Sequence, residues 1–133
     1  MQKHTLGYSL TVLVAMCMGL FMAPACQKPV PVDDSDLARA QLWAVYDAEV
    51  KYRDQLPNHR YSKDLQSLQT AGFLPELPSV PDGSYTFSYS PAVNPDGSVW
   101  SFVVMASPTR SGLPYIMVNA EGDVASSMTK PED

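Results

Sequence analysis

The chain has 133 residues, of which 17% are charged and 45% are hydrophobic, and its net charge at pH 7 is −5. This length corresponds to about one domain. The acidic balance argues against nucleic-acid binding, which requires clustered lysine and arginine. Cys17 lies in an apolar N-terminal run and leaves Cys26 as the only other cysteine. The remainder therefore has no intrachain disulfide and depends on an apolar core.

The first 26 residues have the layout of an export signal. A basic start at Lys3 is followed by an unbroken apolar run over residues 10–23, and Ala23-Pro24-Ala25 directly precedes Cys26. The apolar run is shorter than the ~20 residues that a membrane-spanning helix needs. A basic region, an apolar region and an Ala-x-Ala site together predict a signal peptide over residues 1–25 and an exported protein.

Three kinds of processing remain open at this leader. In the preferred interpretation, cleavage before Cys26 leaves that cysteine N-terminal and lipidated, so that the protein is anchored to a membrane of the cell envelope. In the second, cleavage after Ala25 gives a secreted or periplasmic protein with a free thiol. In the third, cleavage follows Gly7 and keeps the protein in the inner membrane. There Gly7-Tyr8-Ser9-Leu10 resembles the start of type IV pilins and type II secretion pseudopilins, although Val12 stands where that family has glutamate.

A tether and a long helix follow the leader. Residues 26–34 are rich in proline and acidic side chains, which favours an extended segment. From about Asp36 to Leu56, apolar residues recur at spacings of three and four, which predicts one buried helix face. We expect Asp33, Asp34 and Ser35 to cap this helix. Glu49 and Arg53 are spaced for an i,i+4 ion pair. The buried face is expected to hold Leu42, Val45, Ala48, Tyr52 and Leu56.

A second, short helix is predicted after Pro57-Asn58. Ser62 is a suitable N-cap residue, and Leu65 and Leu68 are spaced to point toward the core. Gly72 falls where a left-handed C-terminal cap is needed. A proline-rich loop then leads to a turn at Pro81-Asp82-Gly83.

The apolar period then changes to two, which predicts strands over residues 84–90 and 99–106. Two shorter strands are predicted over residues 115–118 and 124–128, on either side of a turn at residues 120–123. The expected domain, residues 35–128, is of the α+β class, with a long N-terminal helix and a short second helix packed on a three- to four-stranded antiparallel sheet. Residues 129–133 form a polar tail. The alternating aromatic residues are interpreted as core, with a ligand-binding platform on the uncovered sheet face as the alternative; they are Tyr85, Phe87, Trp100 and Phe102.

The region from Leu37 to Ala125 resembles the globular head of type IV pilins and of the type II secretion major pseudopilin. The resemblance is carried by Tyr61-Ser62-x-Asp64-Leu65-x-x-Leu68-x-x-x-Gly72-Phe73-Leu74, by Gly83-Ser84-Tyr85-x-Phe87-x-Tyr89 and by Asn119-x-x-Gly122-x-Val124. It implies a pilin-head-like scaffold that acts through contacts with an envelope protein, such as a component of a secretion or pilus system. It supplies no catalytic residue.

The resemblance also implies candidate calcium ligands. Major pseudopilins bind calcium in loops near the C-terminal strands, where this chain has Asp96, Glu121 and Asp123. Calcium prefers several converging oxygen ligands. The same residues are, however, common in tight turns for backbone reasons alone. No other cofactor is expected.

No catalytic constellation is evident in the sequence. His59 is the only histidine after the leader and lies between polar residues. There is neither a Gly-x-Ser-x-Gly elbow nor a His-Glu-x-x-His motif. Two function classes therefore remain. The first is a non-enzymatic module tethered to the membrane through lipidated Cys26 and bound to an envelope protein. The alternative is a secreted or periplasmic ligand-binding or hydrolytic protein whose site is not visible in the sequence.

Overall fold

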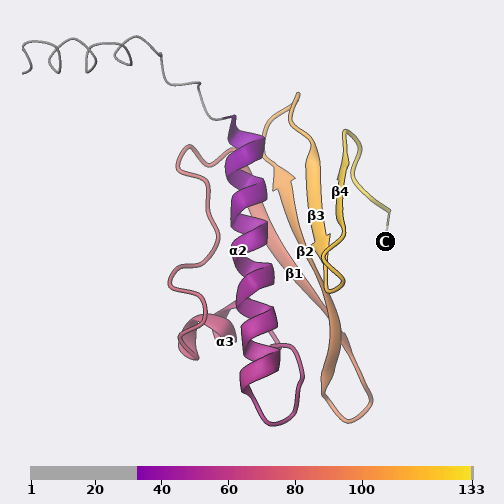
Figure 1. The fold of residues 1–133 in the computed structure, drawn as a ribbon. Helices are drawn as coiled ribbons and strands as arrows, with labels where there is room; N and C mark the ends of the chain where they lie inside the picture. The colour runs from indigo at the N-terminus through magenta and orange to yellow at the C-terminus, as the bar shows by residue number, and fades with distance from the viewer. Residues whose placement is uncertain (1–32, 133) are drawn as a thin grey trace, which may run out of the picture. The chain divides into compact units, whose positions relative to one another are not determined.

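A helix lies across one face of a four-stranded antiparallel sheet (Figure 1). The computed structural model describes residues 33–132, and the predicted leader, Cys26 and most of the tether lie outside them. The helices are α2 (Asp34–Gln55) and α3 (Leu65–Thr70). The sheet has the order β1-β2-β3-β4, with strands β1 (Tyr85–Val93), β2 (Val99–Pro108), β3 (Tyr115–Asn119) and β4 (Val124–Ser127). The α+β class and the antiparallel sheet are confirmed.

Helix α2 buries one stripe of small and apolar side chains against β2 and β3. This stripe contains Ala38, Leu42, Val45 and Ala48, which are almost completely buried. The predicted capping of the helix is wrong in detail. Asp33 is the N-cap residue, but its side chain accepts from the Ser35 hydroxyl at 2.9 Å and not from a backbone N–H. The negative charges of the first turn still face the positive end of the helix dipole.

Helix α3 begins at a different cap from the one predicted. Asp64 accepts the backbone N–H of Ser67 at 2.7 Å, and this hydrogen bond is the main reason that the pKa of Asp64 is lowered. The predicted C-terminal cap is confirmed, because Gly72 has φ +84° and the Phe73 N–H reaches the Leu68 carbonyl at 3.0 Å. A residue with a Cβ resists this left-handed conformation.

The sheet separates a core face from an uncovered face. Tyr89 pairs with Val104 and Phe87 with Ala106, and these residues lie on the face covered by α2. The core of this face is completed by apolar side chains with relative exposures of 0 to 2%, namely Val99, Phe102, Val104, Ala106, Ile116 and Val118. Phe102 and Tyr85 are therefore core residues, as predicted, and Phe87 is half-buried against the core.

Trp100 is the exception among the predicted core aromatics, because 56% of it is exposed. The β1–β2 register shifts between Ala92, which pairs with Ser101, and Val93, which pairs with Val99. Trp100 lies at this bulge and has no partner in β1. A bulge inserts one residue into a strand and re-aims its side chain, so strict alternation does not apply here.

The buried side chain of Leu68 should make α3 sensitive to truncation. Leu68 has 0% exposure, whereas its neighbour Gln69 is exposed. We expect Leu68→Ala to lower the free energy of unfolding by about 2–5 kcal/mol, because the core loses apolar contacts and gains a cavity. Urea denaturation followed by circular dichroism measures this. The control Gln69→Ala should change stability by no more than about 0.5 kcal/mol, and equal effects of the two variants would contradict this packing.

Candidate functional site

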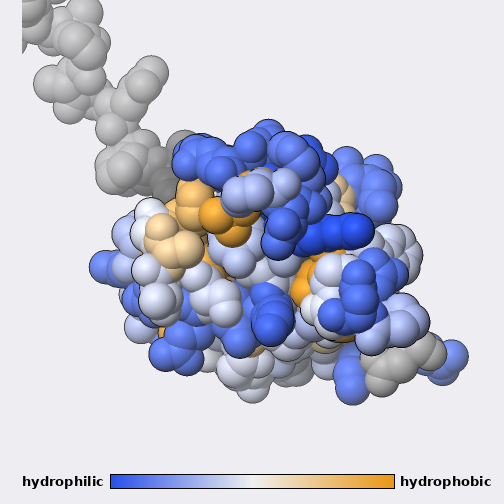
Figure 2. Space-filling model, turned by 90° about the horizontal axis from the view of Figure 1, so that it is seen from below, coloured by the Kyte–Doolittle hydropathy of each residue, from blue (hydrophilic) through white to orange (hydrophobic). Residues whose placement is uncertain are grey.

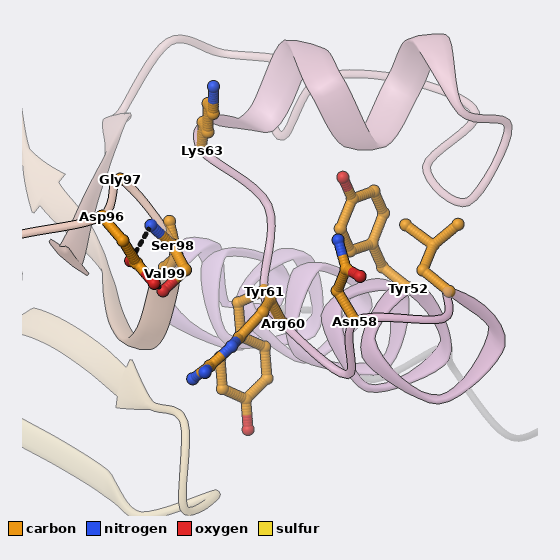
Figure 3. Close-up of a pocket in the computed structure, with 10 residues that line it drawn as sticks. Tyr52, Asn58, Arg60, Tyr61, Lys63, Asp96, Gly97, Ser98 and Val99 are labelled. Carbon is orange, nitrogen blue, oxygen red and sulfur yellow. Dashed lines mark hydrogen bonds between the residues drawn. The ribbon is translucent and has the colours of Figure 1, made fainter. Parts of the chain in front are cut away.

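A cleft of about 290 Å³ opens at the C-terminal end of α2, between that helix end, the segment that follows it and the β1–β2 turn. Figure 3 shows its lining. Seen from this end of the molecule, hydrophilic side chains surround small hydrophobic patches (Figure 2). The lining comes from three segments, which contribute Tyr52 and Leu56, then Asn58, Arg60, Tyr61 and Lys63, and finally Asp96, Gly97, Ser98 and Val99.

Tyr61 is the fixed wall of the cleft. Its backbone N–H donates to the Val99 carbonyl at 3.1 Å, which joins the segment after α2 to the start of β2. Its ring packs edge-on against Phe102 at 4.9 Å between centroids. Arg53 donates to its hydroxyl at 2.9 Å, and the guanidinium carbon lies 5.5 Å from the ring centroid. These contacts hold the ring from both ends.

Arg53 therefore does not pair with Glu49, and the predicted i,i+4 ion pair is wrong. Arg53 instead contacts the carboxylate of Asp54 at 3.1 Å, as well as Tyr61. Glu49 is instead held by Ser62 and has 0% exposure. The reason lies in the helix period: Glu49 is four residues after Val45 and belongs to the buried stripe of α2.

The buried carboxylate of Glu49 holds the segment after α2 in place. The Ser62 backbone N–H donates to Oε2 at 2.9 Å, and the Ser62 hydroxyl donates to Oε1. The Tyr89 hydroxyl lies 2.7 Å from Oε1 and 2.9 Å from the Ser62 carbonyl oxygen. This Glu49–Ser62–Tyr89 cluster joins α2, the connecting segment and β1. Ser62, predicted as a helix cap, is a buried partner of Glu49 instead.

His59 adopts φ +49° and is the only non-glycine residue with positive φ in the part of the chain that the structure describes. Its N–H donates to the Leu56 carbonyl at 3.2 Å, which closes a tight turn directly after α2. Histidine tolerates this conformation better than most residues. Such local strain persists only where surrounding contacts impose it. Here the turn at His59 directs the chain so that Arg60 and Tyr61 line the cleft.

The predicted calcium ligands lie in two different turns. In the β1–β2 turn, Oδ1 of Asp96 accepts from the Ser98 N–H at 2.8 Å and from its hydroxyl at 2.5 Å. These bonds, with a smaller contribution from nearby Arg60, lower the pKa of Asp96. Glu121 and Asp123 belong to the β3–β4 turn, where the Asn119 side chain accepts from both of their backbone N–H groups. Within residues 33–132, no three His, Cys, Asp or Glu side chains are grouped to hold a metal ion.

A second charged cluster lies at the other end of α2. The guanidinium of Arg110 contacts the carboxylate of Asp34 and lies 3.6 Å from that of Asp82. Partial burial of Asp34, followed by its contact with Asp82, raises the pKa of Asp34. The cluster joins the start of α2 to two loops and sets one cation against two acids.

Comparison of the chain with protein-family models, with curated proteins and with solved structures gives no match. Across residues 33–132, neither helix combines the length and the apolar character needed to span a membrane.

The Glu49–Ser62–Tyr89 cluster should contribute measurably to stability. We expect Tyr89→Phe to lower the free energy of unfolding by about 1–3 kcal/mol, because Glu49 and the Ser62 carbonyl lose a donor in a buried site. The control is Tyr52→Phe, since the Tyr52 hydroxyl donates no hydrogen bond to any described residue. Urea denaturation at pH 7 gives both values, and an unchanged stability of Tyr89→Phe would contradict the cluster.

The same hydroxyl predicts a pH dependence. Burial, and then the hydrogen bond to Glu49, raise the pKa of Tyr89. A raised pKa in the folded state means that stability is complete below the unfolded pKa of about 10 and is lost as the pH rises beyond it. We expect the stability of the wild type to fall more steeply above about pH 10 than that of Tyr89→Phe. Parallel curves for the two proteins would contradict this assignment.

Proposed function

We propose that the protein is an exported, non-enzymatic module of the cell envelope, tethered to a membrane through a lipid on Cys26 and acting through protein contacts. The observation that carries this proposal is the order of three segments. An export-type leader ends at Ala23-Pro24-Ala25, Cys26 follows immediately, and a short proline-rich stretch leads to a domain whose first helix begins at Asp34. A single acyl chain gives only marginal membrane binding, so the proposal requires more than one chain on Cys26.

The fold supports a finer version of this proposal, in which the domain is a pilin-like head. A long helix on an antiparallel meander, with a short capped helix between them, agrees with the arrangement that the sequence resemblance implies. Such a head would serve a secretion or pilus system as a scaffold whose loops contact an envelope partner. Similarity of fold alone does not determine function, so the kind of partner must be inferred from the residues on the surface of the domain.

The polar groups inside the domain support a non-enzymatic role. Glu49 is the one fully buried acid among residues 33–132, and both of its oxygens accept hydrogen bonds from Ser62 or Tyr89. The exposed His59 belongs to a tight turn. A ligand-binding role in the periplasm is the second candidate, and the cleft beside Tyr61 favours it.

The anchor can be tested by fractionation. We expect Cys26→Ser to move the protein from the membrane fraction to the soluble fraction, because the acyl chains are the proposed anchor. The matched control is Cys17→Ser, a change within the apolar run that should leave the protein membrane-bound. A wild-type protein that is already soluble, with an unmodified Cys26 as its first residue by mass spectrometry, would contradict lipidation. A methylated Tyr8 at the N-terminus would instead establish processing after Gly7.

A further inference from the structure

Basic charge is concentrated at the end of the domain that carries the cleft. Residues 51–63 contain four basic residues and one acidic residue, while the whole chain has a net charge of −5. Arg53 is engaged by Asp54 and Tyr61. Arg60 and Lys63 are exposed and make no ion pair with any other residue in the described part of the chain. Two exposed cations thus remain without an ion pair, although each has one acidic neighbour whose pKa it helps to lower, Asp96 beside Arg60 and Asp64 beside Lys63.

These two cations lie on different sides of the cleft. In Figure 3 the side chains of Lys63 and Arg60 extend in opposite directions from the segment that runs between them. Because the two side chains diverge, they cannot both bind one small anion. They can instead pair with two acidic groups that are separated along an extended chain. Asp96, the one acid in the lining, directs Oδ1 to Ser98.

Part of the cleft lining is apolar. It comes from Tyr52, Leu56, Tyr61 and Val99. Tyrosine supplies a large contact surface at low cost in conformational entropy, which is why it is frequent at protein interfaces. Ser62, which belongs to the Glu49–Ser62–Tyr89 cluster, directly follows Tyr61. The cluster therefore fixes the position of Tyr61 before any partner binds.

We propose that this cleft binds an extended acidic segment of a protein partner. Two acidic side chains of the segment pair with Arg60 and Lys63, and its apolar residues pack on the apolar part of the lining. This rests on the proposed function, from which it takes the class of partner, and it adds the place and the chemistry of contact. Nucleic acid is disfavoured, because its continuous run of phosphates requires clustered lysine and arginine, and the cleft offers only two diverging cations.

Binding can be measured with a defined probe. The full chain in detergent micelles is titrated against the fluorescein-labelled peptide GEPLEG and its neutral twin GQPLQG, and binding is followed by fluorescence anisotropy. We expect the acidic peptide to bind at least about tenfold more tightly than the neutral one, a difference of about 1.4 kcal/mol. The advantage should shrink with added salt, because the paired charges are exposed. Equal binding of both peptides, or binding of neither, would overturn the proposal.

Charge reversal gives a sharper result. The double variant Arg60→Glu, Lys63→Glu should lose the acidic peptide and bind the basic twin GKPLKG. The matched control, Lys51→Glu with Lys130→Glu, makes the same change in net charge at exposed residues outside the cleft and should keep the wild-type preference. An equal loss of acidic-peptide binding in both double variants would show a general charge effect, and the proposal that the cleft binds the peptide would be overturned. Circular dichroism verifies that both variants are folded.

Photo-crosslinking in cells separates this inference from the proposed function. A photoreactive residue is placed at Asn58 in the cleft or at exposed Thr86 on β1, whose register places it on the uncovered face of the sheet. A crosslink from position 58 that the cleft double variant abolishes supports the inference. A crosslink from position 86 alone overturns the proposal that the cleft is the binding site, and it leaves the proposed function standing. Crosslinks from neither position contradict both.

Discussion

The buried carboxylate of Glu49 is the constraint on which the functional end of the domain depends. An isolated buried carboxylate costs several kcal/mol of desolvation, so it persists only where donors compensate for the lost water. Ser62 and Tyr89 supply those donors from two other segments. The arrangement is therefore close to all-or-none. If α2, the connecting segment and β1 are not in place together, Glu49 is left underpaired, and this penalty selects one position for residues 60–63 and for the cleft that they line.

Much of the fold could be predicted from periodicity. Alternation located β1 and β2, turn residues delimited the shorter β3 and β4, the i,i+3 and i,i+4 spacings located α2, and Gly72 marked the end of α3. The errors share one cause. Local sequence rules fail where contacts with residues distant in the sequence determine the position of a side chain. Glu49 was assigned to Arg53 on spacing alone, although its place four residues after Val45 on the apolar stripe indicated burial. Its partner Tyr89 is 40 residues away, and no local pattern joins them. The Trp100 bulge likewise depends on pairing with β1.

The candidate site was less predictable than the fold. Acidic turn residues predict calcium at Asp96, Glu121 and Asp123, but the described structure distributes them over two turns. The Asp96 carboxylate accepts the Ser98 N–H in one turn, and the Asn119 side chain accepts the backbone N–H groups of Glu121 and Asp123 in the other. The cleft brings together residues from positions 52 to 99, so only the folded chain reveals it. It also lies at the opposite end of α2 from the point where the tether enters. A helix of 22 residues is about 33 Å long, so the cleft lies roughly that far from Asp34 at the start of α2.

The most direct test of this account is amide hydrogen exchange at Ser62. This residue sits between exposed Lys63 and half-buried Tyr61 in a segment with almost no regular structure. If the Glu49 carboxylate holds it, its N–H opens only when the domain unfolds, and it should exchange about as slowly as the amide of Val104 in the central strand β2. An exchange rate like that of Gly112, an exposed loop residue whose N–H donates no hydrogen bond within the described structure, would show that the carboxylate does not hold the segment, and the account of the cleft would be wrong.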